Sequence, residues 1–194
     1  MDYLRWGVLG ASKFALEHLT PAIQLAKNNR FKALASGSKE KAAAFVELEP
    51  EVELYESYDE LLADDGVDAV YIPLPNTMHV DWTIRAIKSG KHVLCEKPIA
   101  MRAEEINELI KLRDDTGLLV AEAYMIVHHP QWQKAKEIVQ SGVLGDLIQV
   151  DSVFSYNNKE DLENIRNNSK MGGGGLPDIG VYTLGSVRFV TGQE

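Results

Sequence analysis

Short apolar runs alternate with longer segments of helical periodicity along most of the chain. The apolar runs have the length and character of strands buried on both faces of a parallel sheet, and they occupy residues 4–9, 31–36, 69–72, 92–95 and 118–121. The segments between them repeat apolar residues at helical spacing, which predicts helices over residues 15–28, 39–48, 58–63, 77–89 and 103–116. This alternation predicts an α/β fold with a parallel sheet and helices on both faces.

Turn and cap residues punctuate this pattern. Thr20 and Pro21 predict an N-cap followed by a proline in the first helical turn, so we expect the first helix to restart there. Gly90 and Gly117 lie where helix C-termini need a residue of left-handed conformation.

The pattern changes after residue 121. A helix is predicted over residues 131–141, an alternating strand over 147–156, and a polar stretch rich in Asn and Lys follows. Four consecutive glycines, 172–175, then precede an apolar helix predicted over residues 178–190. We therefore predict a first domain over residues 1–122 and part of a second over residues 123–194.

Composition narrows the class of protein. The 194 residues are 45% hydrophobic and 25% charged, which is typical of a globular chain. A formal net charge of −9 without a Lys/Arg cluster argues against a nucleic-acid partner. The single cysteine, Cys95, excludes an internal disulfide and favours a reducing compartment. No apolar run is long enough to cross a membrane, so the cytoplasm is the expected location.

A glycine turn follows the first predicted strand. Gly10, Ser12 and Ala15 occupy the three positions of the dinucleotide fingerprint G-x-G-x-x-G/A, with Ser12 in place of the middle glycine. Small residues let a pyrophosphate approach the amides that open the next helix, so the residues expected to bind it are Gly10, Ala11, Ser12, Lys13 and Phe14. The alternative is a strand–turn–helix whose small residues only permit close packing.

The end of the second predicted strand concerns the choice of cofactor. Its residues Ser36, Gly37, Ser38 and Lys39 include no carboxylate to accept from a ribose 2′-hydroxyl, as an NAD site usually does. Hydroxyls and a cation can instead bind a 2′-phosphate, so NADP is predicted, with NAD as the second choice. Capping of a helix by Ser38 is the alternative explanation.

Three further segments carry a resemblance to a known family. They are Tyr71-Ile72-Pro73-Leu74-Pro75-Asn76-Thr77-Met78-His79, Cys95-Glu96-Lys97-Pro98 and the glycine run that continues as Leu176-Pro177-Asp178-Ile179-Gly180-Val181-Tyr182. Together with the glycine turn they resemble the Gfo/Idh/MocA oxidoreductases, particularly the glucose-fructose oxidoreductase, xylose dehydrogenase and dihydrodiol dehydrogenase branches, from residue 4 to residue 194.

The resemblance implies a fold and a set of site residues. It implies an N-terminal Rossmann domain with a doubly wound parallel sheet, followed by the beginning of an α+β substrate domain, C-terminally truncated. Lys97, Asp178 and Tyr182 match the family's catalytic positions. The positions expected near the cofactor are Leu74, Pro75, Asn76, His79, Glu96, Lys97 and Met125. Val127 and His128 stand where the family commonly has an arginine and an aromatic residue, which puts any substrate contact of that arginine in doubt.

Elementary chemistry agrees with these catalytic positions. Oxidation of an alcohol sends a hydride to the nicotinamide and a proton to a base. Tyr182 is a candidate for that base if an ammonium such as Lys97 favours its phenolate, and Asp178 can position the lysine or a substrate hydroxyl. Asp178 and Tyr182 are four residues apart, so on a helix they share one face.

Each candidate also has a structural interpretation. Lys97 can be an exposed loop lysine, Asp178 a helix N-cap, Tyr182 an aromatic residue packed on a neighbour, and His79 a first-turn helix residue. Adjacent side chains such as those of His128 and His129 point apart and have no accompanying ligand set, so no metal site is predicted.

The expected partners follow from the same arguments. The substrate class is a sugar, polyol or vicinal diol, and the alternative function is a dinucleotide-binding module without turnover. An unpaired strand over residues 147–156 and a last helix with apolar Val181, Leu184, Val187 and Val190 predict a homo-oligomer that covers them. The substrate's identity and stereochemistry and the direction of reaction stay open.

Overall fold

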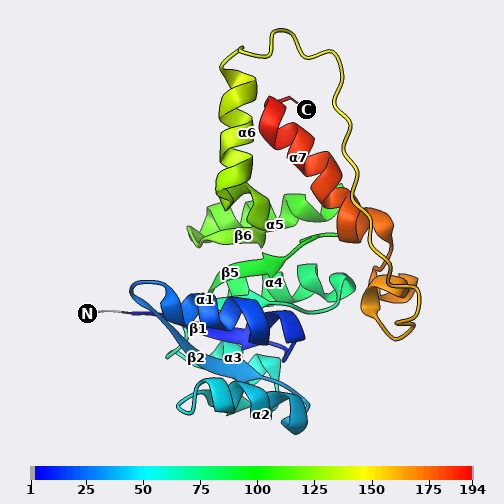
Figure 1. Ribbon diagram of the computed structural model, residues 1–194. Coiled ribbons are helices and arrows are strands. Elements are labelled where there is room, and N and C mark those ends of the chain that lie inside the picture. Colours follow the sequence, from blue (N-terminus) through cyan, green and yellow to red (C-terminus); the bar gives the residue numbers. More distant parts are fainter. Residues whose placement is uncertain (1–2, 194) are drawn as a thin grey trace. The chain divides into compact units, whose positions relative to one another are not determined.

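The computed structural model describes residues 3–193. They divide into two compact units, Met1–Glu122 and Ala123–Glu194, which Figure 1 shows in blue to green and in green to red. Each unit is described by itself.

The first unit is built on a six-stranded sheet. Its strands, in chain order, are β1 (Leu4–Leu9), β2 (Asn29–Ala35), β3 (Glu53–Tyr55), β4 (Ala69–Ile72), β5 (His92–Glu96) and β6 (Val120–Ala123). They lie in the order β3-β2-β1-β4-β5-β6, and β1 pairs in parallel with both β2 and β4. The chain runs outward from β1 to one edge and then to the other, which is the doubly wound order of dinucleotide-binding domains. The predicted fold class is confirmed.

Five α-helices connect these strands. They are α1 (Thr20–Leu25), α2 (Lys39–Leu48), α3 (Tyr58–Ala63), α4 (His79–Lys88) and α5 (Ala103–Thr116). A π-helical turn, Ala15–Leu19, precedes α1, and a 3₁₀ turn, Asn76–Met78, precedes α4. Gly117 ends α5 in the left-handed conformation, as its place in the sequence predicts.

A bulge in β2 places apolar residues on both faces of the sheet. Trp6 pairs with Phe31, but the next residue, Gly7, pairs with Ala33, so Lys32 is the extra residue. Phe31 packs against Phe45 of α2, with ring centroids 6.1 Å apart. Ala33 and Ala35 instead join the apolar cluster that includes Leu61 of α3. Both faces of the sheet are therefore covered.

The predicted restart of the first helix at Thr20 is wrong. Leu19 and Thr20 both have right-handed helical dihedrals, and the Thr20 amide donates to the Ala15 carbonyl, so the helix is continuous there. The amide that Pro21 lacks falls where the π-helical turn meets α1, and the extra residue of that turn makes room for the proline ring. The helix ends at Leu25 rather than at residue 28.

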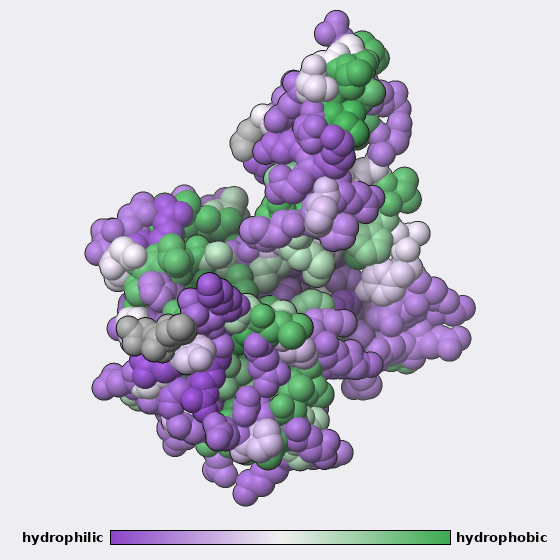
Figure 2. Space-filling model, turned by 60° about the vertical axis from the view of Figure 1, so that its left-hand side comes forward, coloured by the Kyte–Doolittle hydropathy of each residue, from purple (hydrophilic) through white to green (hydrophobic). Residues whose placement is uncertain are grey.

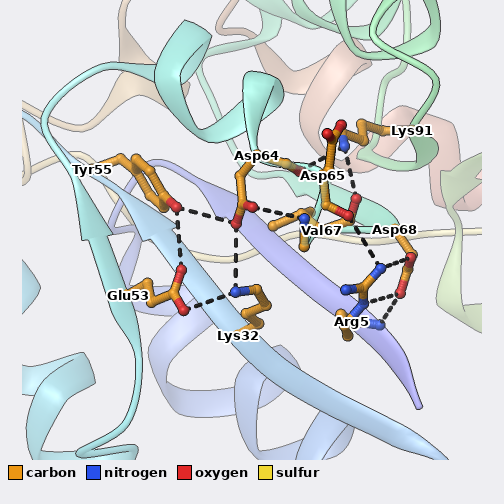
Figure 3. Close-up of polar contacts among 10 residues, drawn as sticks. Arg5, Lys32, Glu53, Tyr55, Asp64, Asp65, Val67, Asp68 and Lys91 are labelled. Carbon is orange, nitrogen blue, oxygen red and sulfur yellow. Dashed lines mark hydrogen bonds and ion pairs between the residues drawn. The ribbon is translucent and has the colours of Figure 1, made fainter. Parts of the chain in front are cut away.

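A polar network surrounds the loop between α3 and β4 (Figure 3). Lys32 lies 2.8 Å from Glu53 and 3.6 Å from Asp64, and Tyr55 donates to both carboxylates. Burial and the hydrogen bond to Asp64 raise the pKa of Tyr55 to about 12. The buried Lys91 ammonium donates to the backbone carbonyls of Asp64 and Val67 at 2.8 Å.

A second part of the network joins β1 to the residue before β4. The Arg5 guanidinium donates to Asp68 Oδ2 at 2.8 Å and to Oδ1 at 2.6 Å, and the Arg5 amide also donates to Oδ2. The hydrogen bond from this guanidinium lowers the pKa of Asp68. A bidentate contact of this kind is stronger than an ordinary surface ion pair.

Replacement of Asp68 by alanine is expected to lower the free energy of unfolding by about 1–2 kcal/mol at neutral pH, because Arg5 loses both acceptors. The stabilisation is present above the unfolded-state pKa of about 4 and is lost as the pH falls through the lower folded-state value. Denaturant unfolding at several pH values should therefore show the variant and the wild type converging in acid. Asp114→Ala, which removes the exposed pair with Arg113, is the control, and an equal loss there would contradict the prediction.

The second unit contains two α-helices, α6 (Pro130–Gln140) and α7 (Val181–Thr191). Short turns flank them: Met125–His128, Ile165–Asn167 and Ser169–Met171 are 3₁₀, and Leu176–Gly180 is π-helical. The predicted helix over residues 131–141 is confirmed. The predicted helix over 178–190 is displaced, since its α-helical part begins at Val181 and Asp178 lies in the preceding π turn.

The strand predicted over residues 147–156 is wrong. This segment forms no ladder, because no described strand lies beside it and a strand is defined by its hydrogen-bonded neighbours. Leu147 and Val150 instead line an apolar groove with Trp132 of α6 and Val187 and Val190 of α7.

Figure 2 shows hydrophobic residues in separate patches on a largely hydrophilic surface. Within residues 3–193, no helix has the length and apolar character to cross a membrane.

Candidate functional site

The glycine turn leaves β1 and opens the first helix. Gly10 has a φ of +101°, and its amide donates to the Ala35 carbonyl of β2 at 2.9 Å. A Cβ atom at this position would lie 2.9 Å from Leu74 Cδ2 in the loop after β4. The positive φ requires glycine, and a side chain at this position would also displace the end of the Leu74 side chain. The turns after β1 and β4 are therefore in contact where the strand order reverses, which is where doubly wound sheets bind ligands.

Ser12 and Ala15 complete the turn. The Ser12 hydroxyl accepts from the Ala15 amide at 3.0 Å, as an N-cap serine does, so this substitution of the middle glycine stabilises the start of the helix. Its hydroxyl hydrogen can still donate to a phosphate oxygen. Ala15 is fully buried, as close packing of the helix on the sheet requires. Phe14 is partly exposed and packs on His18.

The four residues after β2 lie at the same edge of the sheet. Ser36 Oγ accepts from the Ser38 amide at 3.1 Å, and Ser38 Oγ caps α2 by accepting from the Lys41 amide at 3.3 Å. The Ser38 hydroxyl oxygen therefore caps α2, as the alternative explanation held. Lys39 has a 93% exposed side chain, in a loose ion pair with Glu56, and Gly37 has open space around it. The Ser36 hydroxyl itself donates to the Ser38 carbonyl at 3.2 Å, whereas the Ser38 hydroxyl hydrogen and the exposed Lys39 ammonium can contact an anion.

His79 connects the loops that follow β4 and β5. It is 1% exposed, its Nδ1 lies 2.7 Å from the Pro98 carbonyl oxygen, and its Nε2 lies 2.8 Å from the Leu74 carbonyl oxygen. A neutral imidazole has one N–H and can donate to only one of these oxygens, whereas an imidazolium donates to both. His79 is the first residue of α4, as the structural interpretation held, but its ring also joins the proposed cofactor loop to the residue after Lys97.

The segment Glu96-Lys97-Pro98 is held at several points. Tyr71 of β4, fully buried, donates to Glu96 Oε1 at 2.6 Å, and Glu96 Oε2 accepts from the Lys97 amide at 3.2 Å. The Lys97-Pro98 peptide bond is cis. Next along the chain, the Ile99 amide donates to Glu122 at 2.8 Å. Glu96 and Lys97 were predicted as site residues, whereas Glu122 was not, and Tyr71 appeared only as the first residue of a family segment. The available signal for Tyr71 was a tyrosine within a fully buried strand.

The second unit brings Asp178 and Tyr182 next to several aromatic residues. Arg166 Nε donates to Asp178 Oδ1 at 3.0 Å, and the Tyr156 hydroxyl donates to Oδ2. This hydrogen bond to Asp178 raises the pKa of Tyr156. Tyr182 stacks on Tyr124, with ring centroids 5.6 Å apart, and Phe154 packs on it at a tilt. Sequence analysis named none of these four neighbours as a site residue.

Two structural interpretations are decided here. Asp178 is not a helix N-cap, since Gly175 precedes its π turn, Gly180 precedes α7, and the Asp178 amide donates to the Gly174 carbonyl. Tyr182 does pack on its neighbours, as the alternative held, and it does so beside Asp178's turn. Met125 is about half exposed at the start of its 3₁₀ turn. His129 caps α6, and residues 3–193 contain no cluster of side chains suited to a metal ion.

Comparisons with known proteins agree with this arrangement. The model described as "Oxidoreductase family, NAD-binding Rossmann fold" matches residues 4–124, and the GFO/IDH/MocA C-terminal domain matches residues 132–194. The chain belongs to the Gfo/Idh/MocA oxidoreductase family. The family resemblance of the sequence motifs is confirmed, and the first unit is this family's NAD-binding Rossmann domain.

Among the curated members of this family, a dTDP-3,4-didehydro-2,6-dideoxy-α-D-glucose 3-reductase from Streptomyces violaceoruber is 39% identical over 98% of this chain and 55% of its own. A D-xylose 1-dehydrogenase (NADP⁺) from Haloferax volcanii is 36% identical over 97% of this chain and 58% of its own. The chain thus spans little more than half the length of these relatives.

A solved structure of the family has the same fold. It is a 3-ketoreductase from Actinomadura kijaniata in complex with NADP and TDP-benzene, 36% identical, with a TM-score of 0.87 over 93% of this chain and 55% of its own.

Proposed function

We propose that the chain forms the cofactor-binding part of an NADP(H)-dependent oxidoreductase, which transfers a hydride between nicotinamide and a sugar, polyol or vicinal diol. The observation that carries this proposal is a shared edge of the sheet. The Gly10 turn, the residues after β2 that include no carboxylate, and the Glu96-Lys97-Pro98 segment all follow parallel strands, so they lie at one edge.

The residues at this edge fit a dinucleotide. The positive φ of Gly10 directs the chain into the helix that begins after Ser12, whose first amides attract an anionic pyrophosphate. Ser38 and Lys39 supply a donor and positive charge for a 2′-phosphate, and Ser36 adds a donor when its hydroxyl turns away from the Ser38 carbonyl. The xylose dehydrogenase relative is named as NADP⁺-dependent and the ketoreductase was solved in complex with NADP, and both support this choice.

Three residues would serve the reaction itself. When bound, the nicotinamide supplies the acceptor or donor of the hydride. Tyr182 is proposed to exchange the proton of the substrate hydroxyl, and Lys97 to stabilise the negative charge that develops on the substrate oxygen and the Tyr182 oxygen. Asp178 is proposed to orient a substrate hydroxyl. The names of the relatives, which include sugar reductases and a xylose dehydrogenase, support the substrate class.

Cofactor choice provides a direct test. Calorimetric titration should show that NADP⁺ binds at least about tenfold more tightly than NAD⁺, because charge-assisted contacts to the 2′-phosphate contribute more than 1 kcal/mol. Lys39→Ala should weaken NADP⁺ binding about tenfold and leave NAD⁺ binding unchanged. Lys41→Ala, which removes an exposed lysine of the same helix, is the matched control. Tighter binding of NAD⁺ would contradict the NADP assignment, and no binding of either would contradict the proposed function.

A second function is a dinucleotide-binding module without turnover. It requires only the first unit, whose doubly wound sheet and glycine turn are the elements of a dinucleotide site. Turnover with D-xylose, D-glucose and trans-cyclohexane-1,2-diol, followed by NADPH formation, distinguishes the two. NADP⁺ binding without turnover of any of them would support the module.

A further inference from the structure

The carboxylate of Asp178 is engaged through both of its oxygens by two different side chains. Arg166 Nε donates to Oδ1 at 3.0 Å, and the Tyr156 hydroxyl donates to Oδ2. The Asp178 side chain is only 12% exposed, whereas that of Arg166 is 46% exposed. A largely buried carboxylate requires such compensation, because desolvation of an unpaired charge is costly.

The fold around the glycine run delivers Arg166 to this position. A Cβ atom on Gly173 would lie within 2.6 Å of the Arg166 carbonyl oxygen, so only glycine allows the backbone of the Ile165–Asn167 turn to approach. The Gly173 amide donates to the Asn168 carbonyl at 3.0 Å, and the Arg166 amide donates to Asn164 Oδ1 at 3.0 Å. The backbone that carries Arg166 is thus fixed against the segment that leads to Asp178.

The segment that was predicted as a strand delivers the other contact. Phe154 and Tyr156 are two residues apart, so in an extended chain they point to the same side. Phe154 packs on Tyr182, with ring centroids 5.8 Å apart, while Tyr156 binds Asp178. One short segment therefore contacts both residues of the second unit that the proposed function assigns to the reaction.

We propose that Arg166 and Tyr156 are positioning residues that hold the Asp178 carboxylate, ionised and in one orientation, to accept a hydrogen bond from an uncharged substrate hydroxyl. This inference rests on the proposed function, which gives Asp178 its role. Arg166 neutralises the charge of Asp178, so the pair suits a neutral sugar or polyol. Tyr156 fixes the rotation of the carboxylate, which the guanidinium alone, donating to one oxygen through Nε, does not.

The contact itself can be tested without turnover. NMR titration of the full chain labelled at tyrosine Cζ should show Tyr156 titrating above the ordinary value of about 10, and Asp178→Asn should return it toward that value. The signal is assigned by its loss in Tyr156→Phe. If Tyr156 titrates alike in the wild type and in Asp178→Asn, the network does not exist in solution and the proposal is overturned.

The positioning role is tested by kinetics with the most rapidly oxidised compound of the panel above. Arg166→Ala and Tyr156→Phe are expected to lower kcat about 10- to 100-fold, because misplacement of a reacting group by an ångström has effects of this size. The Kd for NADP⁺ should stay unchanged, and Arg166→Lys should restore part of kcat because it keeps the charge. Lys134→Ala removes an exposed ion pair of α6 and is the control.

The glycine run offers a matched pair of variants that leave both side chains in place. Gly173→Ala should lower kcat by displacing the backbone of Arg166, whereas Gly175→Ala should not, since nothing lies within 4 Å of the added Cβ. If the wild type turns over and Arg166→Ala, Tyr156→Phe and Gly173→Ala all keep its kcat, the positioning role alone is overturned. Absence of turnover in the wild type would overturn the proposed function, and the positioning role with it.

Discussion

Replacement of Lys97 by alanine is expected to lower kcat about 10²- to 10⁴-fold, which is the range over which a positioned proton-transfer system contributes to catalysis. The lysine follows β5 directly, and its segment is held by Tyr71 through Glu96 and by Glu122 through the Ile99 amide. So many contacts to one short segment are typical of a residue whose position matters for function. Steady-state oxidation of D-xylose or of the better substrates of the panel, with NADP⁺, measures the effect.

The dissociation constant of NADP⁺ separates this prediction from loss of the fold. Calorimetry should give a Kd for Lys97→Ala within about threefold of the wild type, because the residues proposed to bind the pyrophosphate and the 2′-phosphate follow other strands. Lys111→Ala, at an exposed position of α5, is the control and should change neither quantity. If the wild type turns over and Lys97→Ala has the same kcat, Lys97 has only a structural role. Lys97→Arg tests whether charge alone suffices.

The parallel sheet was predictable because most of its strands contain short, mostly apolar runs. β3 escaped prediction for the opposite reason: Glu53-Leu54-Tyr55 is short and partly exposed, so it has no such run. The segment over residues 147–156 does alternate, but alternation describes only one side of a pairing, and no described strand lies beside this one. A strand pattern in the sequence therefore predicts a surface that fits a sheet, while the sheet itself depends on a partner.

The candidate site shows the same division. The glycine turn and the Glu96-Lys97-Pro98 segment were visible as motifs, because each acts through consecutive residues. The contacts of Asp178 come from residues 22 and 12 positions earlier in the chain, Tyr156 and Arg166, and no local pattern connects them. The interpretation of Asp178 as an N-cap was equally local, and it failed because the π turn moved the start of α7 to Val181.

Among the residues of the first unit, His79 is the one whose contacts with other parts of the chain are expected to have the largest measurable effect. His79→Ala is expected to lower the free energy of unfolding by about 2–4 kcal/mol, because it leaves a cavity and removes the ring that contacts the Leu74 and Pro98 carbonyl oxygens. It should also weaken NADP⁺ binding about tenfold, since the loops at Leu74 and Pro98 are no longer joined and must be ordered when the ligand binds. Denaturant unfolding and calorimetric titration measure the two effects.

Two further variants distinguish the contacts of the His79 ring with the Leu74 and Pro98 carbonyl oxygens from the effect of burial alone. His79→Gln fills much of the same volume and has an amide that can donate to one or both carbonyls, so it should recover part of both the stability and the affinity. His18→Ala, at an exposed position that packs on Phe14, is the control and should cost less than about 1 kcal/mol. A His79→Ala variant that lost stability but bound NADP⁺ as the wild type does would limit His79 to the core. We expect His79→Ala to lose stability and NADP⁺ affinity in proportion, and His79→Gln to recover part of both together. This is the result expected of a residue that sets the distance between two functional loops.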